Sequence, residues 1–212
     1  MNTVIVDYGM GNLRSIQHKL KRIGVEAVVS SSSWDVENAD LLIFPGVGHF
    51  AKGMHNLKEY GLLDVLHWKV KEAKMPVLGI CLGMQLFTRR SEEGDVDGLG
   101  WIDAETRRFC FAPGIGLKIP HVGWNLLNPR RLSPILEGVR SDQRFYFVHS
   151  YHVVCNSPDD VLTTTEYGYR FVSSVHRGNI FGVQFHPEKS HEEGMTVIRN
   201  FFDMFQARQG KS

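Results

Sequence analysis

Four short apolar runs alternate with helix-like segments in the first 80 residues, and this alternation limits the fold more than any other feature of the sequence. The runs span residues 4–6, 27–29, 41–44 and 76–80. Strands that are apolar on both faces are typical of a parallel sheet covered by helices on both sides, whereas a strand with one face in water alternates in polarity. We therefore expect an α/β fold, with Pro45 and Gly46 ending the third strand.

Three segments carry the apolar stripe of an amphipathic helix, with its residues mostly three or four positions apart. The stripes are Leu13, Ile16, Leu20 and Ile23; Leu62, Leu63, Leu66 and Val70; and Met195, Ile198, Phe202 and Phe205. Gly24 follows the first stripe directly and is predicted to end that helix. The polar tail at residues 207–212 is expected to fray.

The middle of the chain, from residue 98 to about residue 174, has short runs, many turn residues and alternating polarity. Residues 144–148 and 161–165 have the composition of strands, and we expect them to extend the same sheet in an antiparallel manner. Residues 179–185 predict a late strand. Because no internal repeat, low-complexity linker or domain boundary is visible, residues 1–212 are expected to form one domain: a mostly parallel central sheet flanked by helices, with an antiparallel extension.

Composition argues against several kinds of partner and location. The 212 residues include 24 Lys and Arg against 23 Asp and Glu, a net charge of +1 that favours neither nucleic acid nor an anionic membrane. No run approaches the roughly 18 apolar residues of a membrane span, and the N-terminus lacks a signal-peptide pattern. The three cysteines form no CxxC pair, which argues against a disulfide framework and favours a reduced, cytoplasmic protein.

No cofactor or metal is expected. The sequence contains no HExxH motif, and Arg14 stands where the turn at Gly9 and Gly11 would need a third glycine to bind a dinucleotide. Cys110 and Cys155 lie in apolar surroundings and are expected to be core residues.

The third cysteine has a different setting. Gly79, Cys81 and Gly83 form a G-x-C-x-G pattern directly after an apolar strand, which is the form of a nucleophile elbow with Cys in place of Ser. Glycines on both sides allow a tight turn from strand to helix, the helix N-terminus favours a thiolate, and the Leu82 N–H would point towards an oxyanion. The alternative is a buried structural cysteine between turn glycines.

A base for this thiol is suggested by His186 and Glu188, which lie just beyond the late strand. Residues two apart in an extended segment share a face, so the carboxylate can hold the imidazole in one tautomer. The alternative is a surface histidine beside a helix start. The glycines of the segment 46–48 follow the third strand and can present a backbone N–H to an anion, although an ordinary turn explains them equally.

These residues resemble the class I (triad-type) glutamine amidotransferase family, whose architecture is flavodoxin-like. The resemblance extends over essentially the whole chain, and the segments that carry it are 7–12, 45–48, 79–85, 120–125, 145–151 and 182–190. Within the family these segments are most similar to the glutaminase subunits of imidazole glycerol phosphate synthases, which act in histidine biosynthesis.

The resemblance implies that glutamine is hydrolysed to glutamate and ammonia by Cys81, His186 and Glu188, through a thioester on the cysteine. It assigns the oxyanion contacts to Leu82, Gly46, Val47 and Gly48, and the glutamine contacts to Gly83, Gln85, Glu93, Ser150 and Tyr151. A flip of the peptide in the 46–48 segment is a plausible switch, and Gly48→Pro should block it.

The resemblance also implies a partner, a (βα)8-barrel cyclase subunit that receives the ammonia in a heterodimer and makes imidazole glycerol phosphate and an aminoimidazole carboxamide ribotide. Its interface positions match Asn12, Trp124, Asn125, Tyr146 and Lys189, although the aromatic members also fit a core. Three alternatives stay open: a glutaminase of another pathway, a stand-alone γ-glutamyl hydrolase with the same residues, and a non-enzymatic α/β binding module.

Overall fold

The computed structural model describes residues 1–209 of the chain, with side chains as far as Gln206. The strands are β1 (Thr3–Val6), β2 (Ala27–Ser30), β3 (Leu41–Gly46), β4 (Val77–Cys81), β5 (Arg90–Ser91), β6 (Val96–Asp97), β7 (Ala104–Arg108), β8 (His121–Leu126), β9 (Asn128–Pro129), β10 (Arg144–His149), β11 (Tyr151–Cys155), β12 (Val161–Tyr167), β13 (Tyr169–Arg177) and β14 (Ile180–Val183). The helices are α1 (Leu13–Arg22), α2 (Ser33–Glu37), α3 (Phe50–Glu59), α4 (Leu63–His67), α5 (Leu82–Leu86) and α6 (His191–Gln209), with a π turn η1 (Trp68–Glu72) and 3₁₀ turns η2 (Pro134–Leu136), η3 (Pro158–Asp160) and η4 (Pro187–Lys189).

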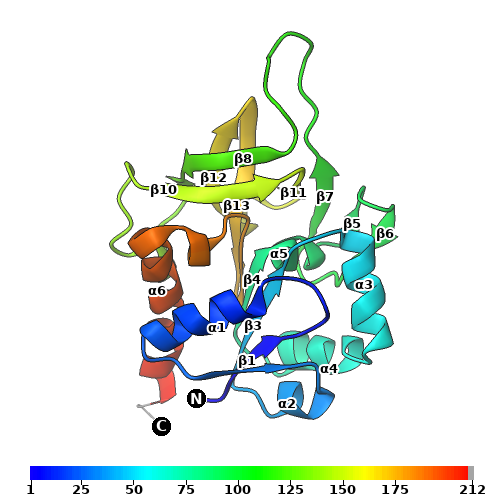
Figure 1. Cartoon of the computed structure of the whole chain (residues 1–212), viewed down its shortest axis with the longest axis vertical. Coiled ribbons are helices and arrows are strands. Elements are labelled where there is room, and N and C mark those ends of the chain that lie inside the picture. The colour runs from blue at the N-terminus through cyan, green and yellow to red at the C-terminus, as the bar shows by residue number, and fades with distance from the viewer. Residues whose placement is uncertain (210–212) are drawn as a thin grey trace.

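The main sheet confirms the expected α/β class. Its strand order is β2-β1-β3-β4-β14-β13-β11-β7-β5-β6, and β2, β1, β3, β4 and β14 run parallel to one another. The next strands, β13, β11 and β7, continue the sheet in antiparallel pairs. Figure 1 shows the helices packed around the parallel half and the antiparallel strands rising above it. In open α/β sheets, ligands bind beyond the carboxyl ends of the parallel strands, so these ends are the place to look for a site.

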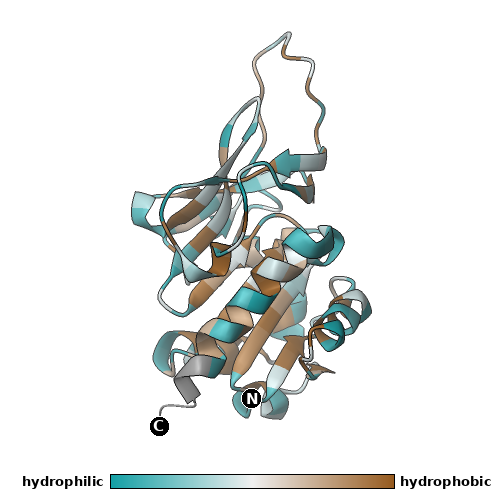
Figure 2. Ribbon diagram, turned by 90° about the vertical axis from the view of Figure 1, so that its left-hand side faces the viewer, coloured by the Kyte–Doolittle hydropathy of each residue, from teal (hydrophilic) through white to brown (hydrophobic). Residues whose placement is uncertain are grey.

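Two apolar layers enclose the parallel strands, because alternate residues of each strand point to opposite faces. Ile5, Ile43 and Leu78 pack with buried residues of α1 and α6, whereas Val6 and Phe44 pack with those of α3, α4 and α5. In Figure 2 the strands of the parallel half are mostly brown, whereas the helices around them carry bands of both teal and brown, as expected for helices that bury one face. Gly24, at a φ of +80°, directly follows the last turn of α1, as predicted.

The third strand does not end where the sequence suggested, because β3 continues through Pro45 and Gly46. Pairing with β1 stops at Ile43, so the missing N–H of Pro45 falls on the side where β1 has already ended. Proline is tolerated in a strand at such an unpaired edge. The extension is important for the site, because it brings Gly46 level with Cys81 in the neighbouring strand β4.

The strand at residues 144–148 is also placed differently from the prediction. It forms β10, which pairs with β8 in a separate two-stranded sheet and does not extend the main sheet. In Figure 1 this pair lies across the top of the parallel half. Its buried residues alternate with half-buried or exposed ones, a pattern that predicts a strand but does not say which neighbour it pairs with.

The expectation that Cys110 and Cys155 are core residues is wrong. Cys110 is exposed and Cys155 only half-buried, so neither is a fully buried core residue, although burial still raises the pKa of Cys155 to about 12. The backbone of residues 207–209 belongs to α6, and the remainder of the predicted tail lies outside the described residues. Among residues 1–209, no helix is long and apolar enough to cross a membrane.

Candidate active site

Cys81 ends β4 and stands directly before the short helix α5, as the elbow pattern predicted. Its φ of 55° and ψ of −110° are unusual for a residue with a side chain, and such strain is found mostly at functional sites. The sequence suggested that Gly79 and Gly83 allow a tight turn, but the structure shows that they are needed for close packing. A Cβ on Gly79 would overlap the ring of Phe87, and one on Gly83 would overlap the carbonyl oxygen of Phe44, so close packing excludes side chains at both positions.

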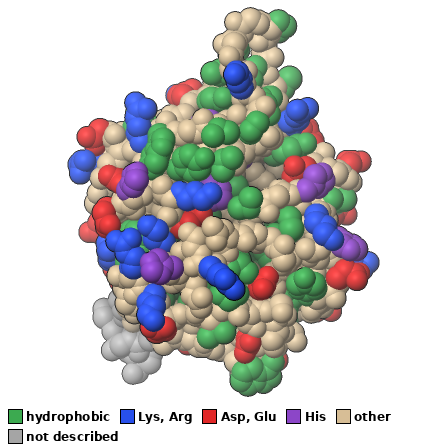
Figure 3. Space-filling model, in the orientation of Figure 1, with side chains coloured by type: hydrophobic (Ala, Val, Ile, Leu, Met, Phe, Trp, Pro, Cys, Tyr) green, Lys and Arg blue, Asp and Glu red, His purple; other side chains and the backbone are tan. Residues whose placement is uncertain are grey.

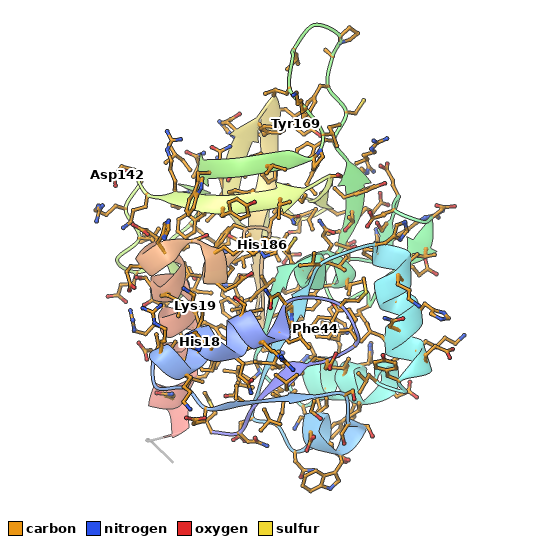
Figure 4. All side chains as sticks on the ribbon, viewed as in Figure 1. His18, Lys19, Phe44, Asp142, Tyr169 and His186 are labelled. Carbon is orange, nitrogen blue, oxygen red and sulfur yellow. The ribbon has the colours of Figure 1, made fainter. Side chains whose placement is uncertain are left out.

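His186 and Glu188 lie beyond the end of β14, the strand next to β4, and both side chains are buried. Nδ1 of His186 and Oε1 of Glu188 are 2.9 Å apart. The loop is held from two sides, because the His186 N–H donates to the Tyr146 carbonyl and the Ser190 hydroxyl donates to the His186 carbonyl. In Figure 4, His186 lies between the β8–β10 pair and the ends of the parallel strands.

The charges of these groups are coupled. Burial by itself lowers the pKa of His186, but the neighbouring Cys81 thiolate and the Glu188 carboxylate outweigh that effect and raise the pKa to about 10. Tyr8 is fully buried, and burial together with the Cys81 charge raises the pKa of its hydroxyl well above the usual range. The arrangement therefore supports an imidazolium that is oriented by a carboxylate next to the Cys81 sulfur, while Tyr8 stays neutral.

A cleft of about 230 Å³ opens beside Cys81. It is lined by Val47, Gly48, Cys81, Leu82, Gln85, Glu93, Pro120, Val148, His149, Ser150 and Tyr151. This set brings together most of the residues expected to bind glutamine or an oxyanion. Gly83, in contrast, packs beneath the cleft against Phe44, so its place in the site is one of support.

Two of the lining residues are also bound to the scaffold. One carboxylate oxygen of Glu93 accepts the Phe50 N–H at 2.7 Å, at the start of α3, where a negative charge is favourable. The side-chain amide of Gln85 donates to the Tyr151 carbonyl at 2.9 Å. Both side chains are therefore held in place before any ligand arrives.

The segment 46–48 runs along the cleft beside the elbow. The Tyr8 hydroxyl donates to the Pro45 carbonyl at 2.7 Å and thereby fixes the start of this segment. A Cβ on Gly46 would overlap the Tyr8 hydroxyl, and Gly48 has a φ of +126° with Met10 Cε 2.6 Å from where its Cβ would be. Proline cannot adopt that φ, so Gly48→Pro would alter the resting segment as well as prevent a flip.

Residues 4–205 match the family model for the class-I glutamine amidotransferases. The chain belongs to this family. Imidazole glycerol phosphate synthase subunit HisH 2 of Pseudomonas aeruginosa is 48% identical to it, over 95% of this chain and 98% of that protein. The subunit HisH 2 of Methanococcus maripaludis is 48% identical over 93% and 96%, and the subunit HisH of Aquifex aeolicus is 46% identical over 95% and 96%.

Solved structures resemble this class-I glutamine amidotransferase in fold. One crystal structure of a glutamine amidotransferase gives a TM-score of 0.75 at 23% identity, covering 96% of this chain and 98% of that chain. The structure of PurLQS from Thermotoga maritima gives 0.71 at 18% identity, with the same coverage.

The residues expected at a partner interface are only partly together in this amidotransferase. Trp124 and Tyr146 are opposite each other in β8 and β10, and the Lys189 ammonium lies 5.7 Å from the Tyr146 ring. Asn125 follows Trp124 in the strand and bonds instead to the Glu166 carbonyl. Asn12 caps α1 through Ser15.

Of the residues expected at a partner interface, the exposed ones form a surface above His186. Trp124 is 40% exposed, so it is not a core residue, and its neighbour Val122 is 56% exposed. In Figure 3, hydrophobic side chains gather on the upper part of the same face, over β8 and β10. The ring of Trp124 also stacks on His191, at 4.8 Å between centroids.

Sequence reasoning missed a buried network beside the cleft. It contains Gln184, His149 and His121, of which Gln184 is fully buried. A hydrogen bond of 3.1 Å joins Nδ1 of His121 to Nε2 of His149, and Nδ1 of His149 donates to the Tyr151 carbonyl at 2.7 Å. All three residues lie in the segments that carry the family resemblance, but only the fold shows that they meet.

The two histidines predict an acid-sensitive fold for this amidotransferase. Burial lowers the pKa of His121 to about 4 and that of His149 to about 3, against 6.5 in the unfolded chain. Below pH 6.5 the unfolded chain therefore binds more protons than the folded one, and stability falls as the pH drops, by up to about 1.4 kcal/mol per unit for each histidine. Urea unfolding at pH 6.5, 6 and 5 measures the slope.

His149→Gln tests this assignment, because glutamine can donate to Tyr151 and accept from His121 without titrating. We expect a shallower loss of stability with acid in this variant. His55→Gln, at an exposed position of α3, should keep the wild-type slope. Equal slopes in all three proteins would contradict the assignment.

Proposed function

We propose that this chain is the glutaminase subunit of an imidazole glycerol phosphate synthase. The observation that carries the proposal is the position of Cys81 on a strained elbow, beside the buried His186–Glu188 pair and at the edge of a cleft. The assignment to this synthase rests on the relatives named as HisH subunits of imidazole glycerol phosphate synthase, two of which are 48% identical to this chain.

The reaction follows from the charges of the pair. The Cys81 thiolate attacks the side-chain carbonyl carbon of glutamine. The resulting oxyanion accepts hydrogen bonds from the backbone N–H groups of Leu82 and the 46–48 segment. The protonated His186 gives its proton to the departing ammonia, leaving a thioester on the sulfur. The neutral imidazole then takes a proton from water, whose oxygen attacks the thioester and releases glutamate. Glu188 keeps the imidazole oriented in both steps.

Specific contacts with glutamine are assigned to the cleft residues. A carboxylate such as Glu93 is suited to the substrate ammonium group, and the backbone at Ser150 and Tyr151, with Gln85, is suited to its carboxylate end. Gly83 contributes by keeping the elbow close to β3. This assignment requires no metal or cofactor.

Ammonia needs a receiver, because free ammonia is protonated and lost in water. We propose that the surface formed by Trp124, Tyr146 and Lys189, together with Asn125 in β8 and Asn12 at the start of α1, binds a (βα)8-barrel cyclase subunit in a heterodimer. The ring-forming lyase step then belongs to that partner. A thiol nucleophile is suited to the reducing cytoplasm, where we place the enzyme.

The test combines this chain with a cyclase subunit and measures glutamate release with and without the cyclase's nucleotide substrate. We expect little release from the chain alone and strong stimulation by the complete mixture. Stimulation by another ammonia-using synthase only would move the protein to another pathway. Rapid hydrolysis of γ-glutamyl peptides by the chain alone would indicate a stand-alone hydrolase, and no hydrolysis under any of these conditions would refute glutaminase function.

A further inference from the structure

In the buried hydrogen-bond network next to Cys81, the Tyr151 carbonyl determines which side chains donate and which accept. The Tyr151 carbonyl can only accept hydrogen bonds, so the Gln85 atom 2.9 Å from it must be the amide nitrogen. The same nitrogen lies 3.0 Å from the side chain of Gln184, which must therefore offer its oxygen. The other end of the Gln184 amide, its NH₂ group, then faces the Cys81 sulfur at 3.6 Å.

The fold brings Gln184 to this position. In the register between β14 and β4, Val183 pairs with Ile80, so the next residue along each chain, Gln184 and Cys81, is again a neighbour. The Gln184 N–H donates to the Ser173 carbonyl at 2.9 Å, which continues the pairing with β13 for one more residue. The side chain is fully buried, so it has no solvent to replace these partners.

The far end of the network is also fixed. The Tyr151 carbonyl accepts a second hydrogen bond from Nδ1 of His149, so Nε2 of His149 must accept from His121. Burial keeps both imidazoles neutral at physiological pH. The donors therefore converge on the Tyr151 carbonyl from both sides, and from Gln85 onwards they point through Gln184 to the sulfur.

We propose that Gln184 is a positioning residue for the nucleophile, whose side-chain N–H stabilises the thiolate form of Cys81 and fixes its direction, with Gln85 and the Tyr151 carbonyl preventing the amide from turning over. The inference rests on the proposed role of Cys81 as the nucleophile. A thiolate accepts an N–H much more strongly than a neutral thiol does, so a donor held at the sulfur favours ionisation.

None of the other groups that the structure describes around the Cys81 sulfur is a neutral side chain that donates a hydrogen bond to it. His186 faces it from the loop after β14 and is oriented by Glu188, while Tyr8 lies nearby with its hydroxyl engaged by Pro45. The Val148 carbonyl, 3.9 Å from the sulfur, can accept from a thiol but repels a thiolate. Gln184 donates to the sulfur without titrating, so its contribution persists when His186 has given up its proton.

The experiment measures alkylation of Cys81 by iodoacetamide as a function of pH, by mass spectrometry of the purified full-length chain. Gln184→Met removes the donor with little change in size. We expect the pH midpoint for Cys81 to rise by about one unit and the rate at pH 7 to fall about tenfold. The exposed Cys110 in the same molecule is the internal reference.

Gln206→Met, at an exposed position of α6, is the matched control and should leave the Cys81 midpoint unchanged. An unchanged midpoint in folded Gln184→Met would overturn the proposal. The assay needs neither glutamine nor a cyclase, so its result is independent of whether the pathway assignment is correct.

A second measurement needs no variant at Gln184. In the NMR spectrum of the wild-type chain, the side-chain amide proton of Gln184 should move downfield with the same pH midpoint as Cys81 alkylation. The movement should vanish in Cys81→Ala. A Gln184 amide signal that does not respond to Cys81 would refute the contact, even if Gln184→Met fails to fold.

Discussion

Replacing Cys81 with serine should lower cyclase-stimulated glutamate release by about 10⁴-fold or more, which is the size of effect that removal of a catalytic nucleophile has in comparable hydrolases. A hydroxyl does not ionise near neutral pH and needs a base to take its proton. The substitution also removes the Cys81 charge, which helps to raise the pKa of His186 to about 10, so the imidazole less often carries the proton that the departing ammonia needs. Steady-state glutamate release from the complete mixture measures the loss.

Two controls separate lost chemistry from lost assembly. Cys110→Ser alters an exposed thiol and should retain full activity. The Cys81→Ser complex should still form imidazole glycerol phosphate when ammonium salt replaces glutamine, because the partner's site is untouched. Substantial glutamine hydrolysis by Cys81→Ser would exclude the thioester route.

The parallel half of the fold is predictable from sequence because its signals are local. The strands β1, β3 and β4 are buried on both faces, so their residues are mostly apolar whatever lies beside them, whereas the edge strand β2 is only partly buried. The pairing of β10 is not local. Its alternating burial fits either sheet, and the choice depends on β8, which lies some twenty residues away along the chain beyond a turn-rich stretch.

The candidate site divides in the same way. The elbow at Cys81 and the pair His186–Glu188 are visible because each is a short motif whose members touch through local geometry. Gln184 lies within the second motif but gains its contact with Cys81 only through the register of β14 on β4. Cys110 was misplaced because apolar neighbours in sequence do not place a residue inside the core.

Replacing Gly83 with alanine should destabilise the fold by about 4 kcal/mol or more, a size reserved for a few mechanisms such as overpacking against atoms that cannot yield. The new methyl group would overlap the carbonyl group of Phe44. That carbonyl is backbone in the centre of β3, two residues before Gly46, so relief requires moving the strand that carries the oxyanion segment. Urea denaturation measures the stability, and the glutaminase assay measures the displacement of the site.

Gly24→Ala supplies the matched control for Gly83→Ala. Gly24 has a φ of +80° with nothing within 4 Å of where its Cβ would be, so it isolates backbone strain, which costs about 1–2 kcal/mol. We expect this variant to lose that stability and to keep its glutaminase activity, because it lies at the far end of α1. If Gly83→Ala is no less stable than Gly24→Ala, α5 does not sit as tightly on β3 as described. A Gly83→Ala protein that folds but hydrolyses glutamine poorly would instead show that the contact with Phe44 sets the position of the elbow.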